Sequence, residues 1–489
     1  MSDRHHVAGS AEGSWRSIVR GPQGRLTVGL SLLTLAVATE SLVITTIMPA
    51  IVQDIGGLAL YGLAFSGFFL AGLAAIPTAG WALDRYGPAR PFAVLMAIFL
   101  LATLAAALAP NMIVLVGARC LQGYGATAQF TISQGTIARA YPVAARVKVL
   151  SLLSATWTLP ALFGPSVGAL ITAAVGWRWA FAAVLGPAIL AAAITFPSLR
   201  AVASPVPSSR PPALTRPFQL ALGAGMFITG LTTPTWWVVP VLVAGLVLMV
   251  RALRQILPAG FMRARPGLPA IITAGFFLNF GIYTAFSFVA LVLTGLRGVS
   301  LGVAAIGVSA AILTWTMGVW INTVLVSRVA GNVLIASAAA LLAAGIVGFG
   351  TAIYDAPLAV PFIAWALAGV GMGIAFNTLT LKTMSAASAG SEGMALASRN
   401  LMGSLGTALG TGIGGAIVAA SQALHLGLRP GLAAIYGLAA ASAIATAALA
   451  MRAAGKLPAH ATVPNESKAE RNAAHPDPSP QTGGDSLRR

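Results

Sequence analysis

Residues 91–138 read PFAVLMAIFLLATLAAALAPNMIVLVGARCLQGYGATAQFTISQGTIA, and Arg119 is the only charged residue among them. A helix crosses the hydrocarbon core of a bilayer in about 20 residues, so this stretch is too long for one span. Proline and asparagine interrupt helices and favour turns, and Ala109-Pro110-Asn111 therefore marks a turn. We expect two membrane-spanning helices here, at 91–109 and 112–138, with an arginine inside the second.

The rest of the chain repeats this pattern of long uncharged stretches. Of its 489 residues, 57% are apolar and 8% are charged, whereas a soluble domain carries roughly 25% charged residues. We therefore expect an all-α polytopic membrane protein. The predicted spans are 27–50, 60–82, 91–109, 112–138, 147–173, 178–199, 217–233, 235–251, 267–294, 301–325, 332–353, 358–381, 396–421 and 430–451.

These fourteen spans form two groups of six with a short pair between them. Each member of the pair has about 17 residues, which is the lower limit for crossing, so a count of twelve stays open. The expected organisation is a cytoplasmic arm at 1–26, an N-terminal six-helix bundle at 27–199, a Pro/Ser-rich cytoplasmic linker at 200–216, an extra helix pair at 217–251, a C-terminal six-helix bundle at 267–451 and a disordered cytoplasmic tail at 452–489.

The net charge of +18 is distributed unevenly between the two sides of the predicted membrane. Lys and Arg concentrate in the cytoplasmic loops of membrane proteins. With the N-terminus inside, the outer side holds only Arg178, Arg297 and Arg429 among the basic residues. This bias predicts a multi-pass protein of the inner or plasma membrane with both termini in the cytoplasm. The basic residues fall between apolar runs rather than on one face, which argues against nucleic-acid binding.

Several classes of protein are disfavoured by what the sequence lacks. Cys120 is the only cysteine, so neither an intramolecular disulfide nor a cysteine metal cluster can form. No G-x-x-x-x-G-K-[ST] stretch occurs, so the chain does not carry its own ATPase. An intramembrane enzyme would need clustered reactive side chains at membrane depth, and we find none. We expect no enzyme activity, no metal and no cofactor.

The acidic residue at membrane depth is Glu40, near the middle of the first span. A charge at the bilayer centre costs roughly 2.5–3.5 kcal/mol even on the lenient scale, and such residues usually have a function. Burial disfavours the charged form of a carboxyl group. Glu40 could therefore bind and release a proton, or attract a cationic substrate. The alternative is a structural carboxyl paired with a basic or polar group on another helix.

Arg119 and Gln122 are the second polar group at membrane depth. Arginine stays protonated in proteins, so its side chain must face a partner or water. It could tune the proton affinity of a nearby carboxyl group. The alternative is a fixed hydrogen-bond bracket to backbone carbonyls, and the sequence does not decide between the two.

Two further motifs lie at the second and fifth spans. Gly80 to Arg90 forms a short inner loop in which Asp84 follows the end of the helix and can pair with a base or a helix N-terminus. Such a pair would hold one gating state, although an ordinary surface turn has similar charges. The fifth span contains Gly164, Pro165 and Gly168. Proline bends a helix, and glycines let a neighbouring helix approach closely, so these residues predict a bend against a neighbouring helix.

Together these motifs resemble the major facilitator superfamily. The inner loop is similar to the family signature G-x-L-x-D-R-x-G-[RK]-[RK], with departures at Ala82, Pro88 and Ala89. The residues that match it are Gly80, Asp84, Arg85, Gly87 and Arg90.

The fourth span matches the family motif R-x-x-Q-G-x-G-A fully, and the family associates this motif with proton transfer. Its residues here are Arg119, Gln122, Gly123, Gly125 and Ala126.

The fifth and first spans resemble those of antiporters within the family. Gly164, Pro165 and Gly168 are similar to the motif G-x-x-x-G-P-x-x-G-G, in which Pro160 and Ala169 here replace the first and last glycines. The fourteen-span drug:proton antiporters have an acid, more often Asp, followed by a proline nine residues later. Glu40 and Pro49 resemble that pair.

The resemblance implies two six-helix bundles of inverted three-helix repeats around a midplane cavity, working by alternating access. It implies proton-coupled efflux, by antiport, of hydrophobic or cationic small molecules by a monomer in the bilayer. The alternatives are an uptake or exchange carrier for a specific metabolite, and a non-transporting scaffold or receptor. Candidate cavity residues, each equally able to be a helix-packing hydrogen bond, are Asn279, Tyr283, Asn322 and Asn377.

Overall fold

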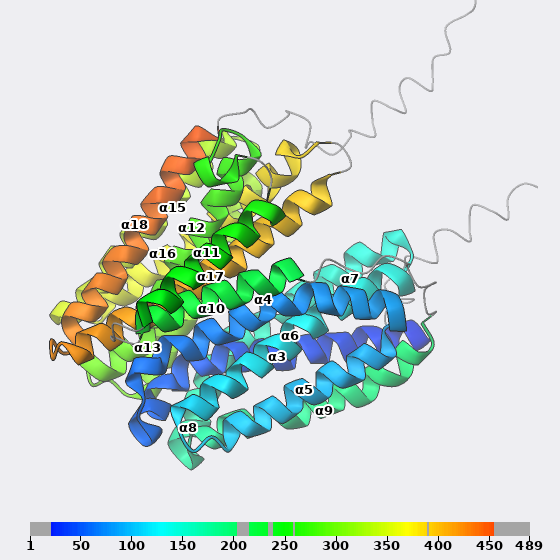
Figure 1. Cartoon of the computed structure of the whole chain (residues 1–489), viewed down its shortest axis with the longest axis horizontal. Helices are drawn as coiled ribbons and strands as arrows, with labels where there is room; N and C mark the ends of the chain where they lie inside the picture. Colours follow the sequence, from blue (N-terminus) through cyan, green and yellow to red (C-terminus); the bar gives the residue numbers. More distant parts are fainter. Residues whose placement is uncertain (1–20, 203–214, 233–237, 258–259, 389–390, 454–489) are drawn as a thin grey trace, which may run out of the picture.

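The computed structural model describes residues 21–202, 215–232, 238–257, 260–388 and 391–453, and within them every regular element is a helix (Figure 1). The expectation of an all-α protein is confirmed. The α-helices are α3 (Gly21–Ile55), α4 (Tyr61–Tyr86), α5 (Ala89–Ala107), α6 (Met112–Ala140), α7 (Val143–Thr156), α8 (Thr158–Val175), α9 (Trp177–Arg200), α10 (Thr215–Thr232), α11 (Val239–Ile256), α12 (Leu268–Phe286), α13 (Val289–Leu291), α14 (Leu301–Leu325), α15 (Gly331–Gly350), α16 (Ala359–Ala386), α17 (Glu392–Ala423) and α18 (Leu428–Arg452).

Twelve helical segments in the described parts of the chain are long and apolar enough to cross a membrane. The segments that count as one span include α7 with α8 and α12 with the π-helical turn at Val292–Leu296. Helices α6 and α10 are not among the twelve, although α6 has 29 residues. Its polar residues Arg119, Gln122 and Gln129 make α6 less apolar than its neighbours. The count of fourteen spans stays a prediction.

The turn predicted at residues 109–111 is confirmed. Helix α5 ends at Ala107 and α6 begins at Met112. The Asn111 side chain accepts a hydrogen bond of 3.0 Å from the backbone N–H of Val114, which satisfies one of the free donors at the start of α6.

The ends of the chain and the linker are covered only in part. Helix α3 already begins at Gly21, within the arm expected at 1–26. Residues 1–20, most of the predicted linker (203–214) and the predicted tail from 454 onward lie outside the described residues.

The fifth predicted span is divided into α7 and α8, which meet at Trp157. Proline lacks a backbone N–H, so Pro160 cannot donate the α-helical hydrogen bond to the carbonyl of Thr156. Just before Pro160, the backbone N–H of Trp157 bonds at 3.2 Å to the carbonyl of Ser154, which lies three residues earlier. Such a bond closes a tighter turn than that of an α-helix. This break leaves the Trp157 side chain exposed at the junction.

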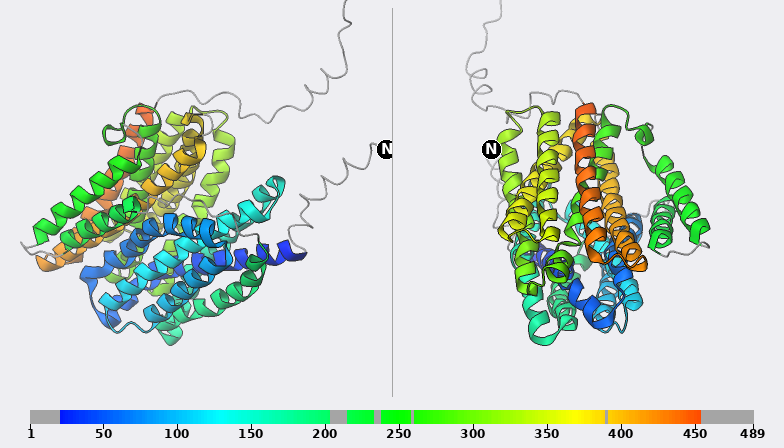
Figure 2. Two further views of the ribbon diagram at one scale, coloured as in Figure 1. Left: turned by 45° about the vertical axis from the view of Figure 1, so that its right-hand side comes forward. Right: turned by 90° about the vertical axis from the view of Figure 1, so that its left-hand side faces the viewer.

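Two helical bundles, α3–α9 and α12–α18, meet at one end and diverge toward the other (Figures 1 and 2). At the shared end, the Tyr61 hydroxyl of α4 donates to the carbonyl of Ser287 at 3.1 Å, and its ring stacks on Phe288 at 5.2 Å. The backbones of Gly62 and Gly415 lie against each other beside this contact. Small residues of this kind let helix backbones approach closely.

The extra pair, α10 and α11, packs against both bundles. The two helices cross where Gly223 meets Gly245. Leu220 and Ile228 of α10 share an apolar cluster with Leu70 of α4 and with residues of α17. Helix α10 therefore covers the seam between α4 and α17, which belong to different bundles (Figure 1).

The seam between the bundles gives a stability test. A methyl group at Gly62 would overlap the Gly415 backbone, whereas one at Gly437 of α18 would meet no atom within 4 Å. Both Gly→Ala changes bring a similar gain in helix propensity, so their difference reports the overlap. We expect Gly62→Ala to cost about 1–3 kcal/mol relative to Gly437→Ala. Thermal unfolding of the detergent-purified variants measures this difference, and equal midpoints would contradict the packing described here.

Candidate functional site

Glu40 on α3 and Arg119 on α6 form an ion pair inside the N-terminal bundle, hereafter the charge pair. The Arg119 Nη1 donates to the Glu40 Oε1. Both residues are only 2% exposed. From the sequence, Glu40 and Arg119 were two separate candidates, and the fold brings them into direct contact.

Arg119 is also held by helix α4 and by its own helix. Its Nε donates to the carbonyl of Ala64 at 3.3 Å, and its Nη1 donates to the Gln122 Oε1 at 3.1 Å. The guanidinium lies 4.5 Å from the centroid of the Phe68 ring, within range of a cation–π contact. Arg119 therefore contacts a carboxyl group and also brackets a backbone carbonyl, and its effect on the proton affinity of Glu40 stays a prediction.

Gln122 extends this network to α5. Its Nε2 donates to the Thr103 Oγ1 at 3.1 Å, and the Thr103 hydroxyl donates to the carbonyl of Phe99 at 2.8 Å. Both Gln122 and Thr103 are fully buried. The charge pair thus connects α3, α4, α5 and α6 through polar contacts, and buried networks of this kind stabilise a structure only when their groups are paired.

One oxygen of the network remains free. Oε2 of Glu40 is buried and has no hydrogen-bond partner among the described residues. The neighbouring side chains on α3, Val43, Ile44 and Ile47, are buried and apolar. A proton could therefore be added to Oε2 while Oε1 keeps its contact with Arg119.

The antiporter-like residues of α8 pack directly beside this site. Gly164, Pro165 and Gly168 are all buried, and Pro165 lies inside the helix. Gly168 faces Val43 of α3 so closely that a side chain would collide with it. These residues therefore let α8 approach α3 within one helical turn of Glu40.

The inner-loop motif differs from the sequence prediction in one respect. Asp84 does not follow the end of the helix but lies in the last turn of α4, which runs to Tyr86 because that turn keeps its hydrogen bonds up to Gly87. Gly87 has a φ of 72°, a conformation in which glycine is favoured, and its N–H bonds to the carbonyl of Leu83.

Asp84 has the basic partner that the sequence analysis expected. Its Oδ1 accepts a hydrogen bond of 2.5 Å from Nη2 of Arg139, and Nη1 of Arg139 donates to the carbonyl of Leu83 at 3.0 Å. Arg139 lies in the last turn of α6, so this contact lies within one bundle. Arg85 lies beside the Tyr86 ring, and Arg90 is exposed in the first turn of α5. A Cβ at Gly80 would meet no atom within 4 Å, so Gly80 makes no tight packing contact.

The four candidate cavity residues lie on three helices of the C-terminal bundle, α12, α14 and α16. Asn322 of α14 accepts a hydrogen bond of 2.7 Å from the Thr378 hydroxyl of α16, which is a helix-packing contact. The Nδ2 of Asn279 donates within α12 to the carbonyl of Gly275. Asn377 is half-buried on α16. The Tyr283 ring packs 5.9 Å from the Phe69 ring of α4 and thus contacts the opposite bundle.

Two buried bases of the C-terminal bundle were not recognised from the sequence. Lys382 and Arg399 are each 3% exposed, although their positions near predicted span ends suggested loops. The Arg399 Nη2 donates to the carbonyl of Phe376 at 3.1 Å, and its guanidinium lies 4.4 Å from that ring. Arg399 already lay inside the predicted span 396–421, and Glu392, an acid of the kind that begins helices, indicates that α17 starts about one turn earlier.

No group of three or more His, Cys, Asp or Glu side chains that could hold a metal ion occurs within the described ranges. The polar centre of the N-terminal bundle thus consists of one carboxyl group, one guanidinium and neutral hydrogen-bonding groups.

The sequence model of the protein family "Major Facilitator Superfamily" matches residues 30–411 of the chain.

The chain belongs to this superfamily. It is 30% identical over 480 residues to a "Probable multidrug-efflux transporter" of Mycobacterium tuberculosis, and the match covers 89% of this chain and 96% of that protein. It is 24% identical over 415 residues to the "Multidrug transporter protein MdtP" of Bacillus subtilis, with 81% of this chain and 76% of that protein covered.

The same fold occurs in a solved transporter structure. The structure of a D-xylose-proton symporter superposes with a TM-score of 0.63 at 15% identity and covers 89% of this chain and 98% of that one. The superfamily member described here is therefore a multi-pass membrane protein and a secondary transporter, not an enzyme.

The charge pair predicts an asymmetric response to substitution. Removing one partner of a buried ion pair costs about 3–5 kcal/mol because the other charge is left unpaired, whereas replacing both by apolar residues is often neutral. We expect Arg119→Met to lower thermal stability strongly and the double variant Glu40→Leu, Arg119→Met to recover most of the loss. Arg178→Met, which breaks a half-exposed pair with Asp54, should change stability by about 0–1 kcal/mol.

The thermal unfolding midpoints of the Glu40–Arg119 variants and of Arg178→Met are measured in the same detergent. A double variant less stable than Arg119→Met alone would show that the two side chains do not depend on each other.

Proposed function

We propose that this superfamily member exports hydrophobic or cationic small molecules in exchange for protons, with Glu40 as the group that carries the proton. The observation behind this proposal is the charge pair, a fully buried carboxyl group with one paired and one free oxygen. The two multidrug transporters to which the chain is similar support the direction and the type of substrate.

The surroundings of Arg119 suit a carboxyl group that changes its charge. When Glu40 is protonated, Arg119 loses its counter-charge, and an unpaired buried charge is costly. Arg119 then keeps the carbonyl of Ala64, the Gln122 amide oxygen and the Phe68 ring as partners. These neutral contacts lower the cost of the protonated state, so Glu40 can alternate between two forms.

The distribution of acids supports a lipophilic or monocationic substrate. Asp54, Asp84 and Asp355 lie at helix ends, where each is paired with an arginine. Among the described acidic residues, only Glu40 lies deep inside a bundle. A multiply charged or strongly polar compound would find few partners at membrane depth.

The distribution of basic residues also supports an orientation with both termini in the cytoplasm. The three basic residues predicted outside all pair with acids, Arg178 with Asp54, and Arg297 and Arg429 with Asp355. The opposite side carries the excess of basic residues expected of a cytoplasmic face. In this orientation the bundles meet at the outer end and diverge toward the cytoplasm, from which an exporter must load its substrate.

In this proposal the transporter works as a monomer in the cell membrane with both termini inside. A single chain already contains both bundles.

The role of Glu40 can be tested by a neutral isostere. Glu40→Gln keeps the size of the side chain but cannot exchange a proton, so we expect it to abolish proton-coupled efflux while the protein still inserts. The matched control is Glu392→Gln, the same change in the first turn of α17, which should retain transport. Proteoliposomes with an imposed pH gradient, tested with a panel of lipophilic and cationic compounds, give both the efflux and the coupled proton movement.

Coupled transport that persists unchanged in Glu40→Gln would exclude Glu40 as the proton carrier. Loss of transport in both variants would point to a structural effect, and reconstituted amounts must therefore be matched.

A further inference from the structure

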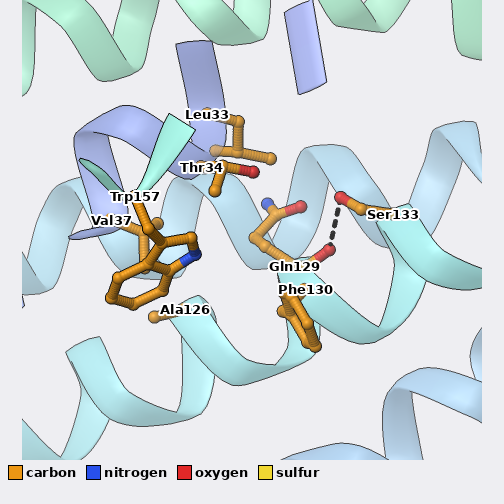
Figure 3. Close-up of a pocket in the computed structure, with 8 residues that line it drawn as sticks. All are labelled: Leu33, Thr34, Val37, Ala126, Gln129, Phe130, Ser133 and Trp157. Carbon is orange, nitrogen blue, oxygen red and sulfur yellow. Dashed lines mark hydrogen bonds between the residues drawn. The ribbon is translucent and has the colours of Figure 1, made fainter. Parts of the chain in front are cut away.

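The recess between α3, α6 and the α7–α8 junction is too small for an organic molecule (Figure 3). Its volume of about 20 Å³ admits about one water molecule. A surface that can hold a larger ligand occurs instead on the extra helix pair, where it is open to the surroundings.

Five exposed arginines gather at one end of the extra pair. The start of α10 lies beside the end of α11, because Nη1 of Arg216 donates to the carbonyl of Gln255 at 3.4 Å. The connector from α11 to α12 begins at the same end. The five residues, hereafter the arginine surface, are Arg216, Arg251, Arg254, Arg263 and Arg265.

Helix α11 has an outward side that is apolar along most of its length and basic at its end. Val243, Val247 and Arg251 follow one another at intervals of four residues, and Arg254 comes three residues later, so all four lie on one side of the helix. Val243 and Val247 are 50% and 49% exposed. Arg254 lies about 10 Å beyond Val247 along the helix axis. This side fits a phospholipid, whose acyl chains would lie beside the valines and whose phosphate would lie near the guanidinium groups.

The connector to α12 places two more arginines beside the end of α11. Phe261 is buried in an apolar cluster with Leu253 of α11, which holds the connector against that helix. Gly260 has a φ of 91°, which glycine adopts readily, and its carbonyl accepts a hydrogen bond of 3.3 Å from the backbone N–H of Arg265. A Cβ at Gly260 would lie 2.7 Å from the Cδ of Arg265. The stem of Arg265 therefore lies over a tight turn, and Arg263 is exposed in the same turn.

The arginine surface has no acid to neutralise it. The sequence contains no Asp or Glu between Asp84 and Asp355. None of the five arginines forms an ion pair with an acid in the described parts of the chain. At the opposite end of the molecule, by contrast, Arg178 and Arg429 each pair with an aspartate. Basic charge without a counter-charge makes this surface attractive to anions.

We propose that the arginine surface binds the phosphate groups of anionic phospholipids, with the acyl chains along the valine side of α11. This inference goes beyond the export function and does not depend on Glu40. Guanidinium groups form charge-assisted hydrogen bonds with phosphate oxygens. Clusters of about four to eight basic residues next to a membrane helix bind anionic lipids, and in the orientation proposed above the surface meets the cytoplasmic leaflet, whose surface potential is negative.

Native mass spectrometry of the full chain in a neutral detergent compares two lipids with the same acyl chains, dioleoylphosphatidylglycerol and dioleoylphosphatidylcholine. The native protein should bind the anionic phosphatidylglycerol more tightly than the zwitterionic phosphatidylcholine. One arginine near an anionic surface is worth about a fivefold change in affinity. We expect the double variant Arg251→Gln, Arg254→Gln to lose about 25-fold in phosphatidylglycerol affinity and less than about twofold in phosphatidylcholine affinity.

Two further double variants separate the arginine surface from the general positive charge of the protein. Arg200→Gln, Arg328→Gln removes the same charge from exposed positions near the ends of α9 and α14, and should keep the phosphatidylglycerol affinity within about twofold. Arg251→Lys, Arg254→Lys keeps the charge and should retain the preference for phosphatidylglycerol. Inorganic phosphate in excess should not displace the lipid, because it lacks acyl chains.

Each contrary outcome overturns the lipid proposal. It fails if the native protein binds the two lipids alike, or if the α9 and α14 variant loses as much phosphatidylglycerol affinity as the glutamine variant of α11. It also fails if the lysine variant loses the preference, or if inorganic phosphate displaces the lipid, since the ligand would then be a soluble anion. None of these results bears on proton exchange at Glu40, which has its own variants.

Discussion

The charge of Arg119 must be balanced inside a membrane bundle, and the packing around it follows from that requirement. Arginine cannot lose its proton, so neighbouring helices have to supply acceptors. Gly123 lies against the backbone of Phe68 on α4, and Gly125 lies against Phe99 and Leu95 on α5. These two glycines let α4 and α5 come close enough for Ala64 and Thr103 to join the network. The motif R-x-x-Q-G-x-G-A thus combines a charge with the space that its partners need.

Much of the fold could be predicted from the sequence, because the bilayer imposes a simple length and polarity rule on each helix. The turn at 109–111 and the all-helical architecture follow from uncharged stretches and their breaks, whereas the division into two six-helix groups and an extra pair stays a prediction. The break at Trp157 was not predicted, since Pro160 could equally have bent a continuous helix. The number of spans is harder to decide, because α6 carries the polar residues of the site and α10, which contains Arg216 and Gln219, is less apolar than the equally long α11.

The sequence predicted the individual residues of the candidate site, but it did not predict that Glu40 and Arg119 contact each other. A lone acid and a lone arginine at membrane depth are conspicuous, yet 79 positions separate them and only the bundle brings them together. The four candidate asparagine and tyrosine residues were suggested by residue type alone, and their role in a shared cavity stays a prediction.

The most direct test of the account is whether binding of a cation releases a proton from Glu40. A lipophilic monocation such as tetraphenylphosphonium is added to the purified transporter in lightly buffered detergent, over a range of pH, and the released protons are measured with a pH indicator. The account predicts proton release in proportion to bound cation from the native protein and from Glu392→Gln, and no release from Glu40→Gln. Equal release from all three proteins would contradict it.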